Sequence, residues 1–491
     1  MAERLIISVS GMRGIVGENL TASVAAEYGS AFGTYLKTED KRRKTEDRKR
    51  RTEDVRQKTE VRVLTSDLRP LTSDICPLMS VCIGMDTRPS GEMLKSAVTA
   101  GLCAAGVDVI DLGVVTTPSV GVMVGELACA GGVVITASHN PIAYNGIKLL
   151  LDNGVAPPAP EAGKIKRCFL EKNFSFVGSA RSGRVTSSDR ADATHVAKVL
   201  KIVDKEAIAA RQFKVVLDSV NGAGGRITKK LLAEFGCEVT AINDEPTGLF
   251  VHGPEPTAAN LTGLCEVVKT RVADVGFAQD PDADRLALVD ENGTYIGEEY
   301  TLALAAKYVF GKRTGNAATN LSTSRMIDDV AGKAGGKVIR TAVGEANVAA
   351  AMLEHDCIIG GEGNGGVIDL RVGPVRDSLV GIALVMQLMA ETGKTISRLV
   401  DEIGGYYMSK DKFSADQDQA RQILESAKEV FAGVKINTTD GCRFDFDDGW
   451  LHLRASNTEP VMRLIVEAKD CPTAQKYIDR VTAIRAKILA H

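Results

Sequence analysis

The sequence predicts an α/β protein with three successive, similar α/β domains that contain mixed sheets, followed by a smaller C-terminal α+β domain. Two observations predict this fold class. Short apolar runs alternate with helical patterns through most of the chain, as βαβ units require. Three such series each end in a cluster of polar residues where a strand stops, which indicates internal repetition. From about residue 413 the pattern changes to one helix followed by alternating strands.

The length of the chain requires several domains, because 491 residues are too many for one hydrophobic core. The changes in pattern predict boundaries that divide the chain into residues 1–185, 186–296, 297–408 and 409–491. Because the strands of each series are joined through helices, we expect mainly parallel or mixed sheets with right-handed crossovers.

The composition is that of an ordinary globular protein, with 44% hydrophobic and 25% charged residues. A formal net charge of -3 gives no general attraction to nucleic acid or to an anionic membrane. The ten cysteines form no Cys-x-x-Cys pair, which argues against a disulfide framework and a structural zinc site. We see no signal peptide and no apolar run near the roughly 18 residues that span a bilayer. We therefore expect a cytoplasmic protein that binds neither nucleic acid nor membranes.

The first domain opens with a short strand that leads to Arg13, which lies between Gly11 and Gly14. Such an arginine could reach a phosphate, although a surface arginine in a turn explains the pattern equally well. A helical pattern then covers residues 21–36. Further strands are expected at residues 81–86, 107–112 and 133–135, and further helices at residues 91–105 and after Pro118.

A repetitive segment, residues 37–78, interrupts this domain. Its period is seven residues, but its first three copies lack the apolar positions that a coiled coil needs. With too little apolar surface to offset the entropy of ordering, we expect a largely disordered insertion. Residues 37–62 hold twelve Lys and Arg against seven Asp and Glu, so a nucleic-acid tether is an alternative to a passive surface insertion. The passive insertion is favoured, because long surface loops cost little stability.

The second and third domains repeat the strand and helix pattern. The predicted strands are residues 213–218, 272–278, 338–340 and 357–359, and the predicted helices begin near Asn221 and cover residues 325–334, 345–353 and 378–392. Ligands in open α/β sheets bind at the carboxyl ends of strands, so catalytic and binding residues are expected there.

The serine loop, residues 136–141, follows an apolar strand and contains Ser138, His139 and Asn140. Ser138 is the candidate nucleophile. A hydrolase is an obvious possibility, but no Gly-x-Ser-x-Gly motif is present, and adjacent residues rarely face each other as base and nucleophile.

The acidic loop, residues 280–285, places Asp280, Asp282 and Asp284 at alternate positions after a strand. Three neighbouring carboxylates repel one another unless a cation binds, and oxygen ligands suit Mg²⁺ or Mn²⁺. The spacing resembles a calcium loop, but Arg285 follows at once and no Glu closes a twelve-residue loop. A solvated acidic turn and a covalent aspartate nucleophile of the haloacid-dehalogenase type remain alternatives.

Two further loops carry groups that suit a sugar phosphate. The glycine loop, residues 361–366, offers Glu362 and Asn364, a pair that suits vicinal hydroxyls, although a plain turn is also possible. The arginine loop, residues 454–460, offers Arg454, hydroxyls and an amide, and Arg463 follows it. Arginine and hydroxyl groups are the donors that bind phosphate monoesters. Together the loops favour phosphoryl transfer, in which the protein positions groups and neutralises charge.

These four loops, in this order, resemble the motifs of the α-D-phosphohexomutase superfamily, which contains phosphoglucomutases, phosphomannomutases and phosphoglucosamine mutases. The motifs are Thr-Ala-Ser-His-Asn-Pro, Asp-Pro-Asp-Ala-Asp-Arg, Gly-Glu-Gly-Asn-Gly-Gly and Arg-Ala-Ser-Asn-Thr-Glu-Pro. The resemblance covers the chain except roughly residues 37–78. It implies four domains around one central cleft, and an intramolecular phosphotransferase, that is, an isomerase.

The resemblance also implies the roles of single residues. Ser138 would carry a phosphoryl group and pass it to a hexose monophosphate, giving a hexose 1,6-bisphosphate that turns over in the cleft. One Mg²⁺ would be held by this phosphoserine and by Asp280, Asp282 and Asp284. Arg285 would neutralise the transferring group, and His139 and Lys148 would be the acid and base candidates. The substrate would be bound by Arg13, Glu362, Asn364, Arg454, Ser456, Asn457, Thr458 and Arg463.

One position departs from the family pattern. Many members end the glycine loop in Ser-Gly-His, whereas this chain has Gly366 in place of the histidine. An acid or base from this loop is therefore in doubt, as is the preferred hexose. The partner expected is a small hexose phosphate, and the protein would be a monomer or a homodimer. A metal-dependent sugar phosphatase and a non-catalytic phosphosugar-binding protein are the alternatives to a mutase.

Overall fold

The computed structural model describes residues 5–8, 11–58, 79–456 and 460–489, with the backbone alone for residues 43–58. Two compact units are present. The first comprises residues 1–115, 120–137 and 143–191, and the second comprises residues 116–119, 138–142 and 192–491. The serine loop thus crosses from one unit to the other, and Ser138 belongs to the second.

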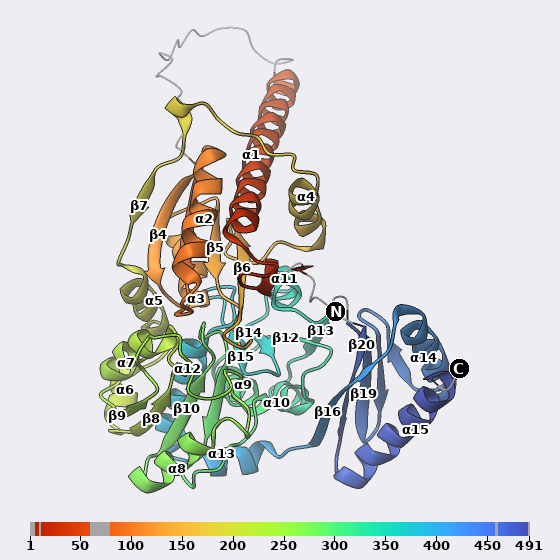
Figure 1. Ribbon diagram of the computed structural model, residues 1–491. Helices are drawn as coiled ribbons and strands as arrows, with labels where there is room; N and C mark the ends of the chain where they lie inside the picture. The colour runs from red at the N-terminus through yellow and green to blue at the C-terminus, as the bar shows by residue number, and fades with distance from the viewer. Residues whose placement is uncertain (1–4, 9–10, 59–78, 457–459, 490–491) are drawn as a thin grey trace. The chain divides into compact units, whose positions relative to one another are not determined.

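The first unit is built on a seven-stranded mixed sheet in the order β1-β2-β6-β5-β3-β4-β7 (Figure 1). The strands are β1 (Ile6–Ser8), β2 (Gly11–Ile15), β3 (Ser80–Met85), β4 (Asp108–Val114), β5 (Gly131–Ile135), β6 (Tyr144–Leu151) and β7 (Val185–Ser187). The strand pairs β5–β3, β3–β4 and β4–β7 are parallel. The strands β1, β2 and β6 pair antiparallel. The expected mixed sheet is therefore confirmed.

Helices pack against this sheet through apolar side chains. They are α1 (Ala22–Lys58), α2 (Gly91–Ala104), α3 (Thr117–Glu126) and α4 (Ala159–Leu170), with a short 3₁₀ helix at Ser179–Arg181. Phe32 of α1 and Leu94 and Val98 of α2 share one buried core with Ile135 of β5. Burial of this core fixes the end of β5, from which the serine loop starts.

The disorder expected from residue 37 is wrong for residues 37–58, because α1 continues to Lys58. Lys, Arg, Glu and Gln are strong helix formers, and extending an existing helix avoids the cost of nucleation. The first part of the extension is also anchored, since Lys37 donates to the carbonyl of Ala105 at 2.7 Å and Glu39 pairs with Lys164 at 3.1 Å. The rest of the predicted insertion, residues 59–78, lies outside the described residues.

The second domain series forms a four-stranded sheet in the order β11-β10-β8-β9. Its strands are β8 (Lys214–Asp218), β9 (Glu238–Ile242), β10 (Val275–Gln279) and β11 (Leu286–Val289), and its helices are α5 (Ala191–Leu200), α6 (Lys205–Ala209), α7 (Gly224–Glu234) and α8 (Thr262–Arg271). Leu264 and Val268 of α8 pack on Val216 of β8 and Val289 of β11. All residues of β10 are buried, as its apolar sequence requires.

The third series forms a similar sheet in the order β13-β12-β14-β15. Its strands are β12 (Ala317–Asn320), β13 (Val338–Thr341), β14 (Ile359–Glu362) and β15 (Gly366–Ile368), and its helices are α9 (Glu299–Lys312), α10 (Met326–Lys333), α11 (Glu345–Glu354), α12 (Ser378–Thr392) and α13 (Ile396–Ile403). Val348 and Met352 of α11 pack on Ala318 and Ile368 of the sheet.

The three α/β sheets share one arrangement of four strands. In each, two strands lie parallel to a middle strand, and one of the two continues directly into an antiparallel partner. This partner is an edge strand in the second and third sheets, whereas in the first sheet it also pairs with β2. The resulting hairpins are β5–β6, β10–β11 and β14–β15. Their tips are the serine loop, the acidic loop and the glycine loop. The repetition expected from the sequence is confirmed, and it places all three loops at equivalent positions of the fold.

The C-terminal domain is a five-stranded antiparallel sheet in the order β16-β20-β19-β18-β17, with two helices packed against it (Figure 1). The strands are β16 (Tyr407–Ser414), β17 (Lys435–Asn437), β18 (Cys442–Phe446), β19 (Gly449–Ala455) and β20 (Val461–Ala468), and the helices are α14 (Gln417–Val430) and α15 (Cys471–Leu489). Ile423 of α14 and Val481 of α15 pack on Phe444 and Leu453. This confirms the predicted α+β domain.

Within the described ranges, no single helix is both long and apolar enough to cross a membrane. The bent pair of α12 and α13, which meet at 93°, passes that test of length and composition only when the two helices are taken together.

Candidate active site

Ser138 lies in the turn after β5 and is 3% exposed. Its hydroxyl donates to Oδ2 of Asp280 at 2.7 Å, and its Oγ is 3.3 Å from Nδ1 of His139. The backbone φ of Ser138 is +50°, a left-handed conformation that costs a non-glycine residue energy. Strained backbone of this kind is concentrated at functional sites, because the surrounding structure must hold it. The loop thus presents the Ser138 hydroxyl to the acidic loop.

The acidic loop brings three fully buried carboxylates together. Each of Asp280, Asp282 and Asp284 has 0% exposure, and one ligand atom from each lies within 4.8 Å of the others. Oδ1 of Asp280 accepts the backbone N–H groups of Asp284 and Arg285, both at 3.1 Å. Burial, and then the charges of Asp282 and Asp284, raise the pKa of Asp280 well above its usual value.

This donor set fits a divalent cation. Carboxylate oxygens are the hard ligands that Mg²⁺ and Mn²⁺ prefer, and a cation would offset the repulsion that raises the pKa of Asp280. Asp280, Asp282 and Asp284 could therefore hold one such ion. The solvated acidic turn considered from the sequence is excluded, because all three carboxylates are buried.

Thr117 orients the middle carboxylate and was missed by sequence reasoning. Its hydroxyl donates to Oδ2 of Asp282 at 2.6 Å, and its backbone N–H donates to the carbonyl of Asp282 at 3.0 Å. Thr117 follows the end of β4, so the rule that polar residues at strand ends form the site could have found it. The contact fixes both the side chain and the backbone of Asp282.

Arg285 shares the acidic Glu255 with His139. The guanidinium of Arg285 donates to Oε1 of Glu255 at 3.1 Å, and Nε2 of His139 lies 3.8 Å from the same oxygen. Glu255 is 45% exposed and was not predicted. The serine loop and the acidic loop are thus connected twice, through Asp280 and through Glu255.

A second serine, Ser119, has the neighbours of a hydrolytic triad. Its Oγ is 2.9 Å from Nδ1 of His195, and Nε2 of His195 is 2.6 Å from Oδ2 of Asp377. Ser119 and His195 are both 0% exposed, however, and Asp377 also caps α12 by accepting two backbone N–H groups. Because no substrate reaches a fully buried hydroxyl, this chain of hydrogen bonds is structural.

The glycines of the glycine loop are required by close contacts. A side chain at Gly365, whose φ is +84°, would collide with the carbonyl of Leu286, and one at Gly363 would collide with the carboxylate of Glu299. The carbonyl of Gly365 also accepts the N–H of Leu286 at 3.0 Å. The glycine loop is therefore attached to the residue that directly follows the acidic loop.

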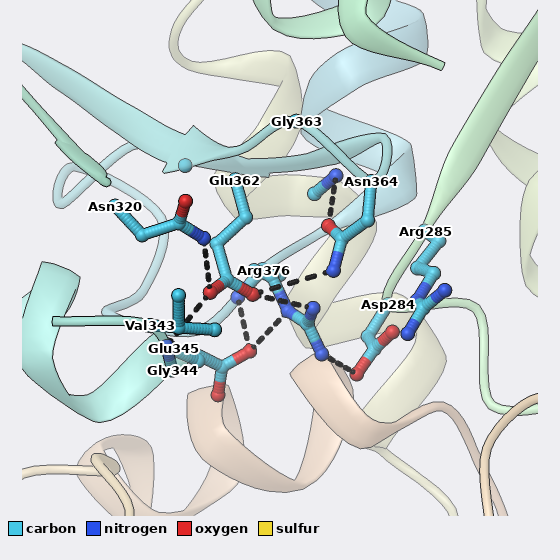
Figure 2. Close-up of polar contacts among 12 residues, drawn as sticks. Asp284, Arg285, Asn320, Val343, Gly344, Glu345, Glu362, Gly363, Asn364 and Arg376 are labelled. Atoms are coloured by element: carbon cyan, nitrogen blue, oxygen red, sulfur yellow. Dashed lines mark hydrogen bonds and ion pairs between the residues drawn. The ribbon is translucent and has the colours of Figure 1, made fainter. Parts of the chain in front are cut away.

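Glu362 and Asn364, both predicted, lie in one hydrogen-bonded cluster (Figure 2). Oε1 of Glu362 accepts from Asn320 at 2.8 Å, and its Oε2 accepts from Asn364 at 3.4 Å. The cluster also contains Arg376, which donates to Oε2 of Glu362 at 2.8 Å and was not predicted. Figure 2 shows that Arg376 reaches Asp284 of the acidic loop as well.

The predicted phosphate-binding arginines lie opposite each other on neighbouring strands. Arg454 of β19 pairs in register with Arg463 of β20. Nε of Arg454 donates to Oδ1 of Asp440 at 3.0 Å, and Oδ2 of Asp440 accepts the N–H of Val343 at 3.0 Å. Ser456 donates its backbone N–H to the carbonyl of Val461. The predicted residues Asn457 and Thr458 lie outside the described residues.

The two remaining predicted residues belong to the first unit. Arg13 lies on β2 and Lys148 on β6, and these strands pair so that Arg13 is opposite Gly146. Both side chains are half-buried. Their proposed roles in binding and proton transfer remain predictions.

A half-buried histidine, His252, which pairs with Asp218 at the end of β8, makes stability depend on pH. Burial alone lowers the pKa of His252, but the hydrogen bond from its Nε2 to Asp218 and the charge of Asp218 raise this pKa above its usual value of about 6.5. The stabilisation from the pair is complete below about pH 6.5 and is lost as the pH rises through the raised pKa.

We therefore expect His252→Gln to lower the urea midpoint of unfolding most at pH 5.5 and least at pH 8.5, because only the charged imidazole gains from Asp218. The measurement is urea unfolding followed by circular dichroism across this range. His355→Gln, at an exposed histidine after α11, is the control and should give no such trend. An equal loss at every pH would contradict the assignment.

Comparisons with known proteins agree with this geometry. Four family models match in succession, described as phosphoglucomutase/phosphomannomutase alpha/beta/alpha domains I, II and III and the C-terminal domain, over residues 47–176, 193–293, 297–406 and 410–484. A phosphoglucomutase/phosphomannomutase of Thermococcus kodakarensis is 39% identical over 476 residues, which are 96% of each chain. A probable phosphoglucosamine mutase of Methanopyrus kandleri is 33% identical over 97% of this chain and 96% of its own.

The fold comparison gives the same result. A crystal structure of a phosphoglucomutase/phosphomannomutase family protein from Burkholderia thailandensis has a TM-score of 0.81 with this chain, at 25% identity and over 98% of both chains. The matches extend through all three repeated domains and the C-terminal domain. The chain therefore belongs to the phosphoglucomutase/phosphomannomutase family of phosphohexomutases.

Proposed function

We propose that the protein moves a phosphoryl group between the 1- and 6-positions of a hexose phosphate, through a phosphoserine at Ser138 and a hexose 1,6-bisphosphate. The observation that carries this proposal is the hydrogen bond of 2.7 Å from Ser138 to Asp280 of the buried acidic loop. Membership of the phosphohexomutase family supports the reaction class. The position of Ser138 supports its role as the phosphoryl carrier.

In the first half-reaction, the bond between phosphorus and Oγ of Ser138 breaks while a sugar hydroxyl forms the new bond to phosphorus. The proton of that hydroxyl passes to His139 or Lys148, the two base candidates, and Ser138 is left as an alkoxide that is reprotonated or rephosphorylated. In the second half-reaction the Ser138 oxygen forms a bond to the other phosphorus of the bisphosphate while the bond from that phosphorus to the sugar oxygen breaks. The protonated His139 or Lys148 returns its proton to the sugar oxygen, which restores the phosphoserine enzyme. Arg285 neutralises charge on the group in transfer.

Magnesium is the proposed metal, one ion per chain, held by Asp280, Asp282, Asp284 and the phosphate on Ser138. The ion supplies neutralisation of charge on the phosphoryl group. The carboxylates hold it in a dry site, since all three are buried. Hexose 1,6-bisphosphate would also activate the enzyme, because it phosphorylates Ser138.

Substrate recognition is assigned to the glycine and arginine loops. Glu362 and Asn364 are proposed to bind sugar hydroxyls. The phosphate that does not react is proposed to be bound by Arg454, Ser456, Asn457, Thr458 and Arg463, and Arg13 is proposed to contribute to substrate binding. The pairing of Arg454 with Arg463 supports this assignment, because residues directly opposite on antiparallel strands point to the same face of the sheet.

The proposal is tested with glucose 1-phosphate, mannose 1-phosphate and glucosamine 1-phosphate, each with Mg²⁺ and a catalytic amount of a hexose 1,6-bisphosphate. We expect conversion of at least one to its 6-phosphate, with no release of inorganic phosphate, and a phosphorylated Ser138 peptide by mass spectrometry. The three sugars follow from the names of the relatives. Release of inorganic phosphate would indicate a phosphatase instead, and binding without turnover would indicate a non-catalytic protein.

A further inference from the structure

Arg376 contacts three carboxylates that come from three separate segments (Figure 2). Its two terminal nitrogens donate to Asp284 of the acidic loop at 2.7 Å and to Glu362 of the glycine loop at 2.8 Å. Its Nε donates to Glu345, the first residue of α11, at 2.8 Å. The side chain is only 11% exposed, so these ion pairs are largely shielded from water.

Arginine is suited to this position. Its planar guanidinium directs donors in fixed directions, and here each nitrogen serves a different carboxylate, whereas the ammonium of lysine is a compact point charge. Burial opposes the charge, but the charges of Asp284, Glu362 and Glu345 raise the pKa of Arg376 well above its usual value. The residue therefore stays charged at every physiological pH.

The space for Arg376 is provided by Gly366, the last residue of the glycine loop. A Cβ at Gly366 would collide with the aliphatic part of the Arg376 side chain. The ion-pair cluster therefore requires glycine at position 366, because Arg376 occupies the volume that a side chain there would need.

Arg376 also determines how Glu362 is presented. Oε1 of Glu362 accepts from Asn320 at 2.8 Å and from the N–H of Gly344 at 3.0 Å, which leaves Oε2 to be oriented by Arg376 and Asn364. The same guanidinium orients Oδ2 of Asp284. A change in charge at Asp284 is therefore transmitted to Glu362 through one rigid group.

We propose that Arg376 is a positioning residue that couples metal binding at Asp284 to sugar binding at Glu362. This inference rests on the proposed function. A cation at the acidic loop attracts the carboxylate of Asp284 and weakens its ion pair with Arg376. The ion pair between Arg376 and Glu362 then becomes stronger, and it holds the Glu362 carboxylate in one orientation for the sugar. By linkage, the sugar phosphate then raises the affinity for the cation by the same factor.

The test measures this linkage at equilibrium, in the full-length chain without a bisphosphate primer. Mn²⁺ binding is followed by electron paramagnetic resonance with and without saturating glucose 1-phosphate. We expect the sugar phosphate to tighten Mn²⁺ binding at least about fivefold in the wild type, within the usual range of coupling between sites. In Arg376→Lys, which keeps the charge, we expect this factor to fall below about twofold, because lysine cannot bridge the carboxylates.

Gly366→Ala provides a second variant that leaves every charge in place. Its Cβ displaces Arg376, so the coupling factor should fall as in Arg376→Lys, and this result stands even if Arg376→Lys fails to fold. Arg371→Lys is the matched control. Arg371 lies in the same segment and pairs with Asp369, so the wild-type coupling factor should persist.

A wild-type coupling factor in a folded Arg376→Lys or Gly366→Ala protein would overturn the proposal, as would a wild type that shows no linkage. A structural role alone would lower the melting temperature of the variants without changing the factor. Failure of the proposed function is recognised separately, because turnover of the sugar phosphates is measured in the wild type and the linkage is measured by binding.

Discussion

Ser138→Ala is expected to lower kcat for phosphohexose interconversion by about 10⁴-fold or more, the scale on which a covalent catalyst loses activity when its nucleophile is removed. Alanine cannot carry the phosphoryl group, so no bisphosphate forms. The measurements are turnover of the preferred hexose 1-phosphate and intact mass, which should lose the phosphorylated species. The melting temperature should change little, since the substitution removes a single oxygen atom, whose hydrogen bond to Asp280 contributes about 1 kcal/mol net to stability.

Ser119→Ala is the matched control for this result. Ser119 also bonds to a histidine, but it is fully buried and its hydrogen-bond chain ends at the cap of α12. Its loss should cost about 1–3 kcal/mol of stability, because His195 loses a buried partner, and should leave kcat within a few-fold of the wild type. Retained turnover in Ser138→Ala, or abolished turnover in a folded Ser119→Ala, would reverse the assignment of the two serines.

Asp282→Ala is expected to lower kcat about 10³-fold, because charge stabilisation by a bound metal contributes several kcal/mol in the transition state. The wild type should also melt at a higher temperature when Mg²⁺ is added, since a ligand of the folded state stabilises it. This increase should disappear in the variant. The measurements are steady-state kinetics over a range of Mg²⁺ concentrations and thermal melting with Mg²⁺ or with a chelator.

Asp274→Ala is the control for the metal-binding prediction. Asp274 directly precedes β10, whereas the acidic loop follows the other end of this strand. The carboxylate of Asp274 accepts the N–H of Lys214 at 2.7 Å. Its replacement should lower stability by about 1 kcal/mol and preserve both kcat and the effect of Mg²⁺ on melting. If both variants respond equally to Mg²⁺, the acidic loop is not the metal site.

Much of the candidate site could be predicted because its residues lie at the ends of apolar strands. Ser138, the three aspartates and Glu362 all follow or end such strands, and a strand-end rule needs only local sequence. Sequence periodicity also indicated the three repeated sheets. That Ser138 and Asp280, which are 142 residues apart, lie near each other was implied only by the family resemblance, and their hydrogen bond was not predicted.

The residues that were missed act through contacts between distant segments. Thr117 and Asp282 are 165 residues apart, and Arg376 and Asp284 are 92 residues apart. Nothing local distinguishes Arg376 from a surface arginine, because its burial depends on the space left by Gly366. The extension of α1 was missed for a local reason. Its apolar content is too low to give an amphipathic helical pattern, although its residues have a high intrinsic helix propensity.

The repeated hairpins have a consequence for the order in which the protein folds. A hairpin closes within about 1–10 μs, because its strands are neighbours in sequence, whereas a parallel pair such as β8 and β10 must first close a long loop. The turns of β5–β6, β10–β11 and β14–β15 can therefore adopt their shape while the remaining pairings are still forming. We therefore expect the serine, acidic and glycine loops to take their shapes in three local folding events, before the long-range strand pairings form.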